Sequence, residues 1–173
     1  MAVTLNTPLI LVDDEDLYRV SQENRAYRFE REANGAVTVS PNYTNGGRKS
    51  GKAYAQLLAY AERFGGQAFD SSSGFALGPG KRTWAPDAAW VSQERIDSLT
   101  AQQKAKYWPI SPNVAIEVKS ETDDFAETVS RVEAFVDRGS QYAVAINPMT
   151  REVEPRGTLP PNLEIDFDAI IDG

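Results

Sequence analysis

The chain has 173 residues, of which 41% are hydrophobic and 25% charged, and its formal net charge is −7. This length and composition are typical of a globular chain, and we expect a single domain over residues 1–173. The absence of cysteine and histidine excludes thiolate zinc sites and Ser-His-Asp triads, so any metal would have to bind oxygen ligands, as Mg²⁺ and Mn²⁺ do.

The sequence contains no signal for a membrane. No stretch approaches the roughly 20 consecutive apolar residues that a membrane-spanning helix needs. The first residues have neither a basic start nor a clear cleavage site. We therefore expect a cytoplasmic protein with no membrane partner.

The first third of the chain alternates helical and extended patterns. Residues 9–20 predict a short helix with acidic residues near its start. Residues 26–40 predict a hairpin, because two pairs of apolar residues recur with period two around an Ala-Asn-Gly turn. A loop rich in asparagine and glycine at 41–47 precedes a helix over 50–64, which two glycines end.

Two extended segments follow in the middle of the chain. They span residues 67–77 and 84–91 and are separated by a Gly-Pro-Gly turn. Residues 92–108 are expected to be partly helical, with Thr100 and Gln103 forming a capping box.

The clearest strand of the sequence is 113–119, where apolar residues alternate strictly. We expect a helix after it, with Thr122 as its cap and Gly139 at its end. Residues 142–146 are almost all apolar, which is typical of a central strand buried on both faces. The tail is expected to add an edge strand near 151–155 and an amphipathic end piece.

The core order is therefore helix, strand, strand, strand, helix, strand. Consecutive strands joined by turns, followed by one helical crossover, predict an α/β fold with a mixed sheet flanked by helices. The hairpin precedes this core.

One group of polar residues lies on the predicted core strands. Alternation along 113–119 places Glu117 and Lys119 on the same face, about 7 Å apart, and opposite an apolar face. Asp87 opens the preceding extended run, so it reaches Glu117 if the two strands pair. Two carboxylates at that range repel each other, and a proton or a divalent cation resolves the repulsion.

The pattern alone has low specificity. Chance predicts roughly one acid-x-Lys match and roughly one Pro-Asp pair in a chain of this composition. The sequence has one of each. Charged side chains that are solvated or paired for structural reasons therefore remain an alternative to a catalytic site.

Several longer blocks resemble a known family. They are Arg28-Phe29-Glu30-Arg31 with Gly35 and Ser40-Pro41, Phe69-Asp70-Ser71-Ser72-Ser73-Gly74-Phe75, Pro86-Asp87-Ala88-Ala89-Trp90-Val91, Pro112-Asn113-Val114-Ala115-Ile116-Glu117-Val118-Lys119-Ser120, Gly139, and Ala145-Ile146-Asn147-Pro148. Together they resemble the Uma-two family of restriction-endonuclease-like proteins, within the PD-(D/E)XK nuclease superfamily. The resemblance covers nearly the whole chain and implies the αβββαβ core of that superfamily.

The resemblance also implies roles for individual residues. Asp87 and Glu117 would bind a divalent metal, Mg²⁺ or Mn²⁺, with help from the Val118 carbonyl. Lys119 would be the catalytic lysine. The expected reaction is magnesium-dependent hydrolysis of DNA phosphodiester bonds by an endonuclease.

Two further positions are compared with the family pattern. Glu30 matches an acid that completes the catalytic site in the family, although a solvated hairpin glutamate explains it equally well. The helix after the third strand usually carries a lysine, where this chain has Arg131. The two cations are not interchangeable, which leaves a supporting role for Arg131 open.

The charge distribution bears on the partner. Residues 44–82 carry more basic than acidic side chains, namely Arg48, Lys49, Lys52, Arg63, Lys81 and Arg82 against Glu62 and Asp70. These charges either form a local basic face or are scattered and solvated. The tryptophans at 84, 90 and 108 are candidates for base stacking, but core packing is the more common use.

Three functions are therefore kept open. The first is a DNA endonuclease, for which a homodimer is compatible with double-strand cleavage by two symmetric sites. The second is a non-catalytic binding or assembly module that retains the fold, which the net charge of −7 favours. The third is a metal-dependent hydrolase of a small phosphate ester.

Overall fold

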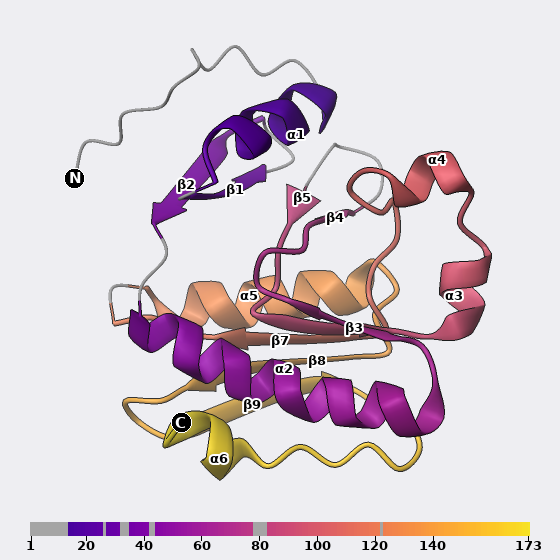
Figure 1. The fold of residues 1–173 in the computed structure, drawn as a ribbon. Coiled ribbons are helices and arrows are strands. Elements are labelled where there is room, and N and C mark those ends of the chain that lie inside the picture. Colours follow the sequence, from indigo (N-terminus) through magenta and orange to yellow (C-terminus); the bar gives the residue numbers. More distant parts are fainter. Residues whose placement is uncertain (1–13, 26, 32–34, 42–43, 78–82, 122) are drawn as a thin grey trace.

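The structure is a computed structural model that describes residues 14–25, 27–31, 35–41, 44–77, 83–121 and 123–173 (Figure 1). Its main sheet has five strands in the order β3-β6-β7-β8-β9, namely Gln67–Asp70, Ala88–Val91, Val114–Val118, Tyr142–Asn147 and Glu152–Gly157. The pair β7 and β8 is parallel, and the other three pairs are antiparallel.

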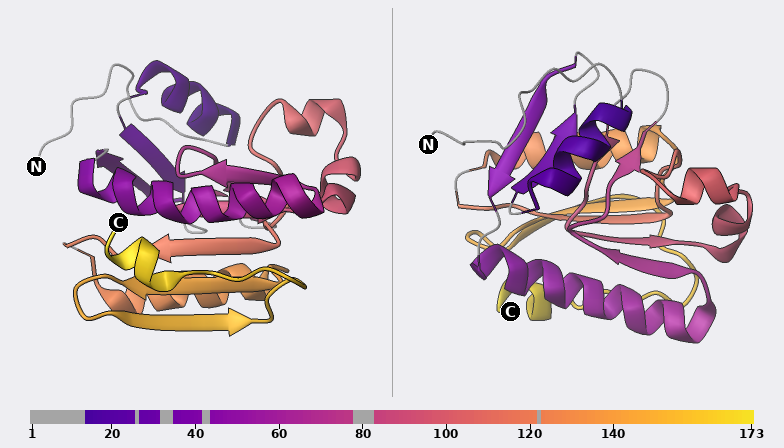
Figure 2. Two further views of the ribbon diagram at one scale, coloured as in Figure 1. Left: turned by 60° about the horizontal axis from the view of Figure 1, so that its bottom comes forward. Right: turned by 45° about the horizontal axis from the view of Figure 1, so that its top comes forward.

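Two helices cover the opposite faces of this sheet (Figures 1 and 2). Helix α2 (Thr44–Phe64) packs Ala53, Leu57 and Tyr60 against one face. Helix α5 (Phe125–Asp137) makes the crossover between β7 and β8 and packs Val132 and Phe135 against the other. The predicted αβββαβ core and the mixed sheet flanked by helices are confirmed.

A second, smaller sheet lies beside the first. Its four strands run in the order β2-β1-β5-β4, namely Val37–Pro41, Tyr27–Arg31, Thr83–Trp84 and Phe75–Ala76. The predicted hairpin forms its β1 and β2, which pair from Tyr27 opposite Pro41 to Arg31 opposite Val37. Helix α1 (Asp14–Glu23) covers this sheet, with Leu17 and Val20 packed on Phe29.

The two predicted extended segments are each interrupted, which corrects the sequence analysis. Residues 67–77 divide into β3 and β4, because Asp70 Oδ1 accepts a hydrogen bond from Ser72 N (3.0 Å) and turns the chain. Residues 84–91 divide between β5 and β6 around Pro86, which has no N–H to give to a sheet. Each segment therefore contributes to both sheets rather than to one.

The remaining differences lie at helix ends. Helix α2 begins at Thr44, inside the predicted loop, because its first residues, Thr-Asn-Gly-Gly-Arg-Lys, show no apolar period that would predict a helix. Helix α5 begins at the N-cap Asp124, whose side chain accepts from Ala126 N, whereas Thr122 lies outside the described residues. Helix α1 ends at Glu23, three residues beyond the predicted end.

The other elements are short. Helices α3 (Gln93–Asp97) and α4 (Ala101–Lys104) follow β6, and α6 (Phe167–Ile171) lies near the C-terminus. The capping box predicted at Thr100 and Gln103 is present at the start of α4. Within the described ranges, no helix has the length and apolar character required to span a bilayer.

Candidate functional site

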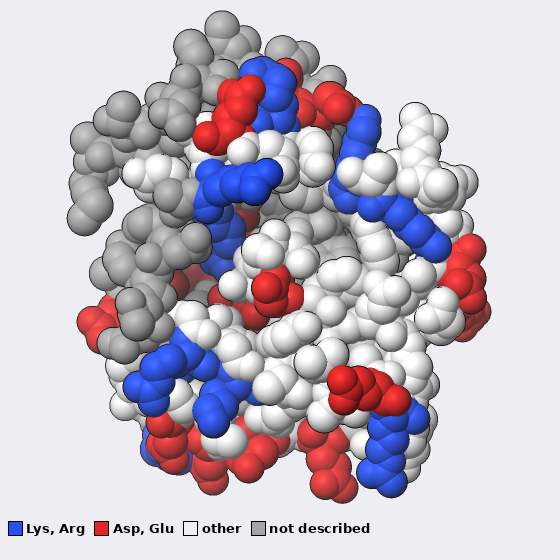
Figure 3. Space-filling view, in the orientation of Figure 1, with Lys and Arg blue, Asp and Glu red and all other residues white. Residues whose placement is uncertain are grey.

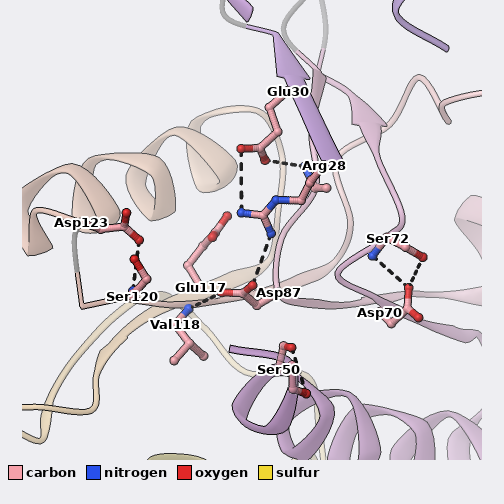
Figure 4. Close-up of polar contacts among 12 residues, drawn as sticks. Arg28, Glu30, Ser50, Asp70, Ser72, Asp87, Glu117, Val118, Ser120 and Asp123 are labelled. Atoms are coloured by element: carbon pink, nitrogen blue, oxygen red, sulfur yellow. Dashed lines mark hydrogen bonds and ion pairs between the residues drawn. The ribbon is translucent and has the colours of Figure 1, made fainter. Parts of the chain in front are cut away.

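A large cavity opens between the two sheets. Its volume is about 1980 Å³, and its lining includes residues of β1 and β2, the end of β7, and the N-terminal turns of α2 and α5. Lys, Arg, Asp and Glu side chains are interspersed on the face of the molecule shown in Figure 3. The candidate site residues lie at the boundary between the two sheets, and Figure 4 shows most of them.

Asp87 and Glu117 meet because β6 and β7 pair. Ala88 lies opposite Ile116, so one further step of the antiparallel register places Asp87 opposite Glu117. Side chains directly opposite in an antiparallel pair lie on the same face. The expected juxtaposition of these two carboxylates is therefore present in the fold, and both line the cavity.

The next step of the register brings the Val118 backbone into the site. Val118 N donates to Asp87 Oδ2 at 2.7 Å, so the carboxylate of Asp87 is fixed by the strand beside it. The residue opposite Val118 is Pro86, which has no N–H for the Val118 carbonyl.

Glu30 arrives from the small sheet. On β1, Phe29 faces helix α1, and alternation turns Glu30 toward the main sheet. Its side chain is only 4% exposed. Its Oε1 accepts from Ala85 N at 2.9 Å, which replaces part of the hydration that burial removes.

Arg131 joins Glu30 to Glu117. From α5 it donates Nη2 to Oε1 and Nη1 to Oε2 of Glu30, at 2.8 and 3.0 Å. Its Nη2 and Nε also donate to Oε1 of Glu117, at 3.1 and 3.4 Å. The guanidinium stacks on the Trp84 ring, 4.8 Å from its centroid. The planar fork of an arginine makes this double contact, which a lysine could not reproduce.

Arg28 forms a looser contact with the third carboxylate. It lies two residues before Glu30 and therefore on the same face of β1. Its Nη1 donates to Asp87 Oδ1 at 3.4 Å, and its Nη2 lies 4.0 Å from Glu30 Oε2 (Figure 4). Burial alone would lower the pKa of Arg28, but the charges of Glu30 and Asp87 outweigh it and raise that pKa.

The cluster has more negative than positive charge. Glu30, Asp87 and Glu117 supply three carboxylates, and Arg28 and Arg131 supply two guanidiniums. The pKa of Glu30 is lowered, because Arg131 and Arg28 outweigh its desolvation.

Asp87 and Glu117 show the opposite shift. Burial raises the pKa of Asp87 despite the attraction of Arg28. Burial, opposed by Arg131 and aided by repulsion from Asp87, raises the pKa of Glu117 to about 7. The two carboxylates that face each other across β6 and β7 are therefore the acids whose charged forms are least favoured by the fold.

Lys119 lies at the edge of this cluster. Its backbone N donates to Ile146 O (2.8 Å), which keeps the end of β7 paired with β8. Its ammonium donates to Ser120 O at 2.8 Å, and the side chain lines the cavity. No hydrogen bond joins it to a carboxylate among the described residues.

Arg131 separates Glu30 from Glu117. Across the described ranges, no group of three or more acidic side chains is arranged to hold a metal ion. The reason is geometric, because Arg131 occupies the space between Glu30 and Glu117. Asp87 and Glu117 are the two carboxylates that the pairing of β6 and β7 places opposite each other.

The sequence analysis did not assign Arg28 to the site and left the role of Arg131 open. Arg28 was visible only as part of the Arg-Phe-Glu-Arg block, whose period-two spacing from Glu30 was the available signal. The residues joined by Arg131 are 14 and 101 positions away in the sequence. No local pattern reveals pairs at that separation.

Described members of the basic stretch lie at both ends of helix α2. Arg48 and Lys49 line the cavity at the N-terminal part of α2. Arg63 lies at the other end of the same helix and stacks on Phe64, at 5.2 Å. Lys81 and Arg82 lie outside the described residues. Trp84 and Trp90 are buried, at 3% and 7% exposure, which favours packing over base stacking for both.

Known proteins resemble the chain in both sequence and fold. A family model described as "Uma2: Putative restriction endonuclease" matches residues 14–156. Among solved structures, a crystal structure of a "putative nuclease belonging to DUF820" from Anabaena variabilis ATCC 29413 is similar, with 14% identity and a TM-score of 0.64. The match covers 83% of this chain and 89% of that one, and at this identity it shows the fold.

A comparison with curated proteins gave no match. The family match covers most of the chain and includes all the residues of the cluster. The chain therefore belongs to the Uma2 family, as the sequence blocks indicated.

Proposed function

We propose that this protein is a magnesium- or manganese-dependent endonuclease that hydrolyses DNA phosphodiester bonds. The observation that supports this most is the pair Asp87 and Glu117, opposite each other on adjacent strands and beside a cavity. The family description and the fold of the similar nuclease agree with it.

The donor set suits a hard divalent cation. Such ions bind carboxylate and carbonyl oxygens and keep several waters. Asp87, Glu117 and the Val118 carbonyl would supply three oxygens. Burial raises the pKa of both acids, and a cation bound between them would favour their charged forms. These residues therefore fit the ion that the fold family implies.

The charge balance also suits a phosphodiester. The three carboxylates and two guanidiniums leave one negative charge. A divalent cation together with one phosphodiester anion would bring the total to zero. Charges buried together are tolerated when they are compensated, so substrate and cation should bind better together than apart.

The residues have separate roles in the proposed reaction. A bound cation would polarise the phosphodiester and lower the pKa of a bound water. Lys119, on the same face of β7 as Glu117, orients the attacking water and stabilises charge that develops on the phosphoryl oxygens. Glu30 holds Arg131 in place and acts as a positioning residue.

Metal binding and cleavage test the proposal together. Calorimetric titration of Mn²⁺ should show binding to the wild type that Asp87→Ala and Glu117→Ala abolish. Cleavage of a plasmid should require the same two acids and Lys119. Glu121→Ala removes an exposed acid from the cavity wall and is the matched control. If the double variant of Asp87 and Glu117 binds metal normally, the site assignment is wrong.

A non-catalytic module is the second candidate. The observation that favours it is that each acid of the cluster already has a partner and that Lys119 binds the Ser120 carbonyl. It predicts a folded protein with no cation binding and no metal-dependent turnover. A small phosphate ester as substrate is separated from DNA by a panel of both under the same conditions.

A further inference from the structure

The two arginines of the cluster are held very differently. Arg131 forms a bidentate pair with Glu30, contacts Glu117 and stacks on Trp84. Arg28 has one hydrogen bond to the cluster, at 3.4 Å, and an ion-pair contact at 4.0 Å. Hydrogen bonds between charged groups are normally about 2.7 to 2.9 Å, so the Arg28 contacts are long and weak.

We propose that Arg28 is a substrate-binding residue that serves as the counter-ion of Asp87 in the free protein. When a divalent cation binds at Asp87, Arg28 leaves the carboxylate and donates to the substrate phosphate. This inference rests on the proposed function, because it needs a cation at Asp87 and a phosphodiester in the cavity.

Position supports this role. Arg28 belongs to β1 of the small sheet and faces Asp87 on the main sheet, so it bridges the two walls of the cavity. Its side chain is 25% exposed, and Asp87 is 17% exposed, so both reach the solvent of the cavity. Glu30 and Glu117, at 4% and 6%, are far less accessible. Arg131 is exposed to a similar extent, at 23%, but its bidentate pair with Glu30 holds it in place. Arg28 is therefore the accessible arginine with only long contacts, and Asp87 is the accessible acid.

Charge supports it as well. Asp87 Oδ2 accepts a hydrogen bond from Val118 N, and Asp87 Oδ1 accepts one from Arg28. A cation bound at Oδ1 would repel the Arg28 guanidinium, because like charges repel strongly where water is scarce. The fork of a displaced guanidinium matches two phosphate oxygens, which makes it a natural clamp on a phosphodiester.

The test compares two affinities in the same variants. Mn²⁺ binding to the free protein is measured by calorimetry, and binding of a fluorescein-labelled DNA oligonucleotide is measured by anisotropy with Ca²⁺ in place of Mg²⁺. The variants are Arg28→Ala, Arg28→Gln and Arg28→Lys. Arg25→Ala is the control, because Arg25 lines the same cavity and contacts Gln22 rather than an acid.

Opposite shifts are expected for the two ligands. Removing the competing charge in Arg28→Ala or Arg28→Gln should tighten Mn²⁺ binding by about tenfold, whereas oligonucleotide binding should weaken by about tenfold or more. Arg28→Lys should retain part of the oligonucleotide affinity. The control should change neither value by more than about twofold.

Three results would overturn the inference. Unchanged or weaker Mn²⁺ affinity in both neutral variants would show that Arg28 does not compete with the cation. Unchanged oligonucleotide affinity would show that Arg28 does not bind the substrate. A parallel loss of both affinities in folded variants, confirmed by circular dichroism, would indicate a purely structural role. Failure of the wild type to bind Mn²⁺ would instead contradict the proposed function itself.

Discussion

Replacing Glu117 with glutamine should stabilise the folded protein at pH 8, although Glu117 is a candidate metal ligand. The Glu117 side chain is only 6% exposed, and burial together with repulsion from Asp87 raises its pKa from 4.5 to about 7, against the attraction of Arg131. Glutamine has nearly the same shape and an oxygen that can still accept from Arg131. It cannot carry the negative charge that the cluster leaves uncompensated.

The size of the effect follows from linkage between protonation and folding. A carboxyl whose pKa is higher in the folded than in the unfolded state binds its proton more tightly when folded. Stability is therefore full below pH 4.5 and is lost as the pH rises through about 7. The difference between 4.5 and about 7 corresponds to about 3 kcal/mol of unfolding free energy. Glu117→Gln should recover most of it at pH 8.

Urea unfolding followed by tryptophan fluorescence at pH 5.5 and pH 8 measures this effect. Glu30→Gln is the matched control, because Glu30 binds the same arginine but has a lowered pKa. Its charge stabilises the fold above pH 4.5, so its loss should cost about 3 kcal/mol at pH 8. If Glu117→Gln also destabilises at pH 8, Glu117 is fully compensated by Arg131, and the reasoning about excess charge is wrong.

Three further predictions concern other parts of the chain. Lys119→Ala should reduce cleavage by about 100-fold or more. Its Mn²⁺ affinity and its stability in urea should not change, because the Lys119 ammonium contacts the Ser120 carbonyl and not a carboxylate. A loss of metal binding would contradict the assigned role. Arg131→Met should lower the unfolding free energy at pH 8 by about 3 to 5 kcal/mol, because it leaves two buried acids unpaired, and a loss of less than about 1 kcal/mol in urea titrations would refute this. Gly157→Ala should lower the melting temperature more than Gly139→Ala: both have positive φ, but only the Cβ at Gly157 would meet backbone, at 2.3 Å from a carbonyl oxygen. Equal decreases in melting temperature for the two variants would show that the backbone around residue 157 shifts to make room for the Cβ.

The core could be predicted from sequence because its signals are local. Strand β7 alternates apolar residues over five positions, and α5 repeats them at helical spacing, so each element follows from its own residues. Strand β8 is a single apolar run, as expected of a strand between two neighbours. The placement of Asp87 beside Glu117 then needed only the pairing of consecutive strands.

Only the hairpin of the small sheet could be predicted, because the addition of β4 and β5 depends on distant contacts. Strands β4 and β5 contain two residues each, too few for any period to be visible. Among the described residues, strand β5 joins the hairpin through the pair Arg31 opposite Thr83. The signals for the two breaks were the serines and glycine after Asp70 and the proline at 86, which the prediction of two long segments passed over.

The same distinction applies to the candidate site. The acids of the site were found through motif spacing, but their energetics depend on Arg28 and Arg131, which come from other elements. Those arginines divide the cluster into two parts. Glu30 and Arg131 form a closed, buried pair that braces the small sheet against α5.

Asp87 and Glu117 form the other part, where burial raises the pKa of both acids and Asp87 adds repulsion on Glu117. An arrangement selected for stability alone would favour a neutral residue at position 117. A buried carboxylate with a raised pKa beside a cavity is an arrangement typical of functional sites, and it agrees with the cation site proposed here.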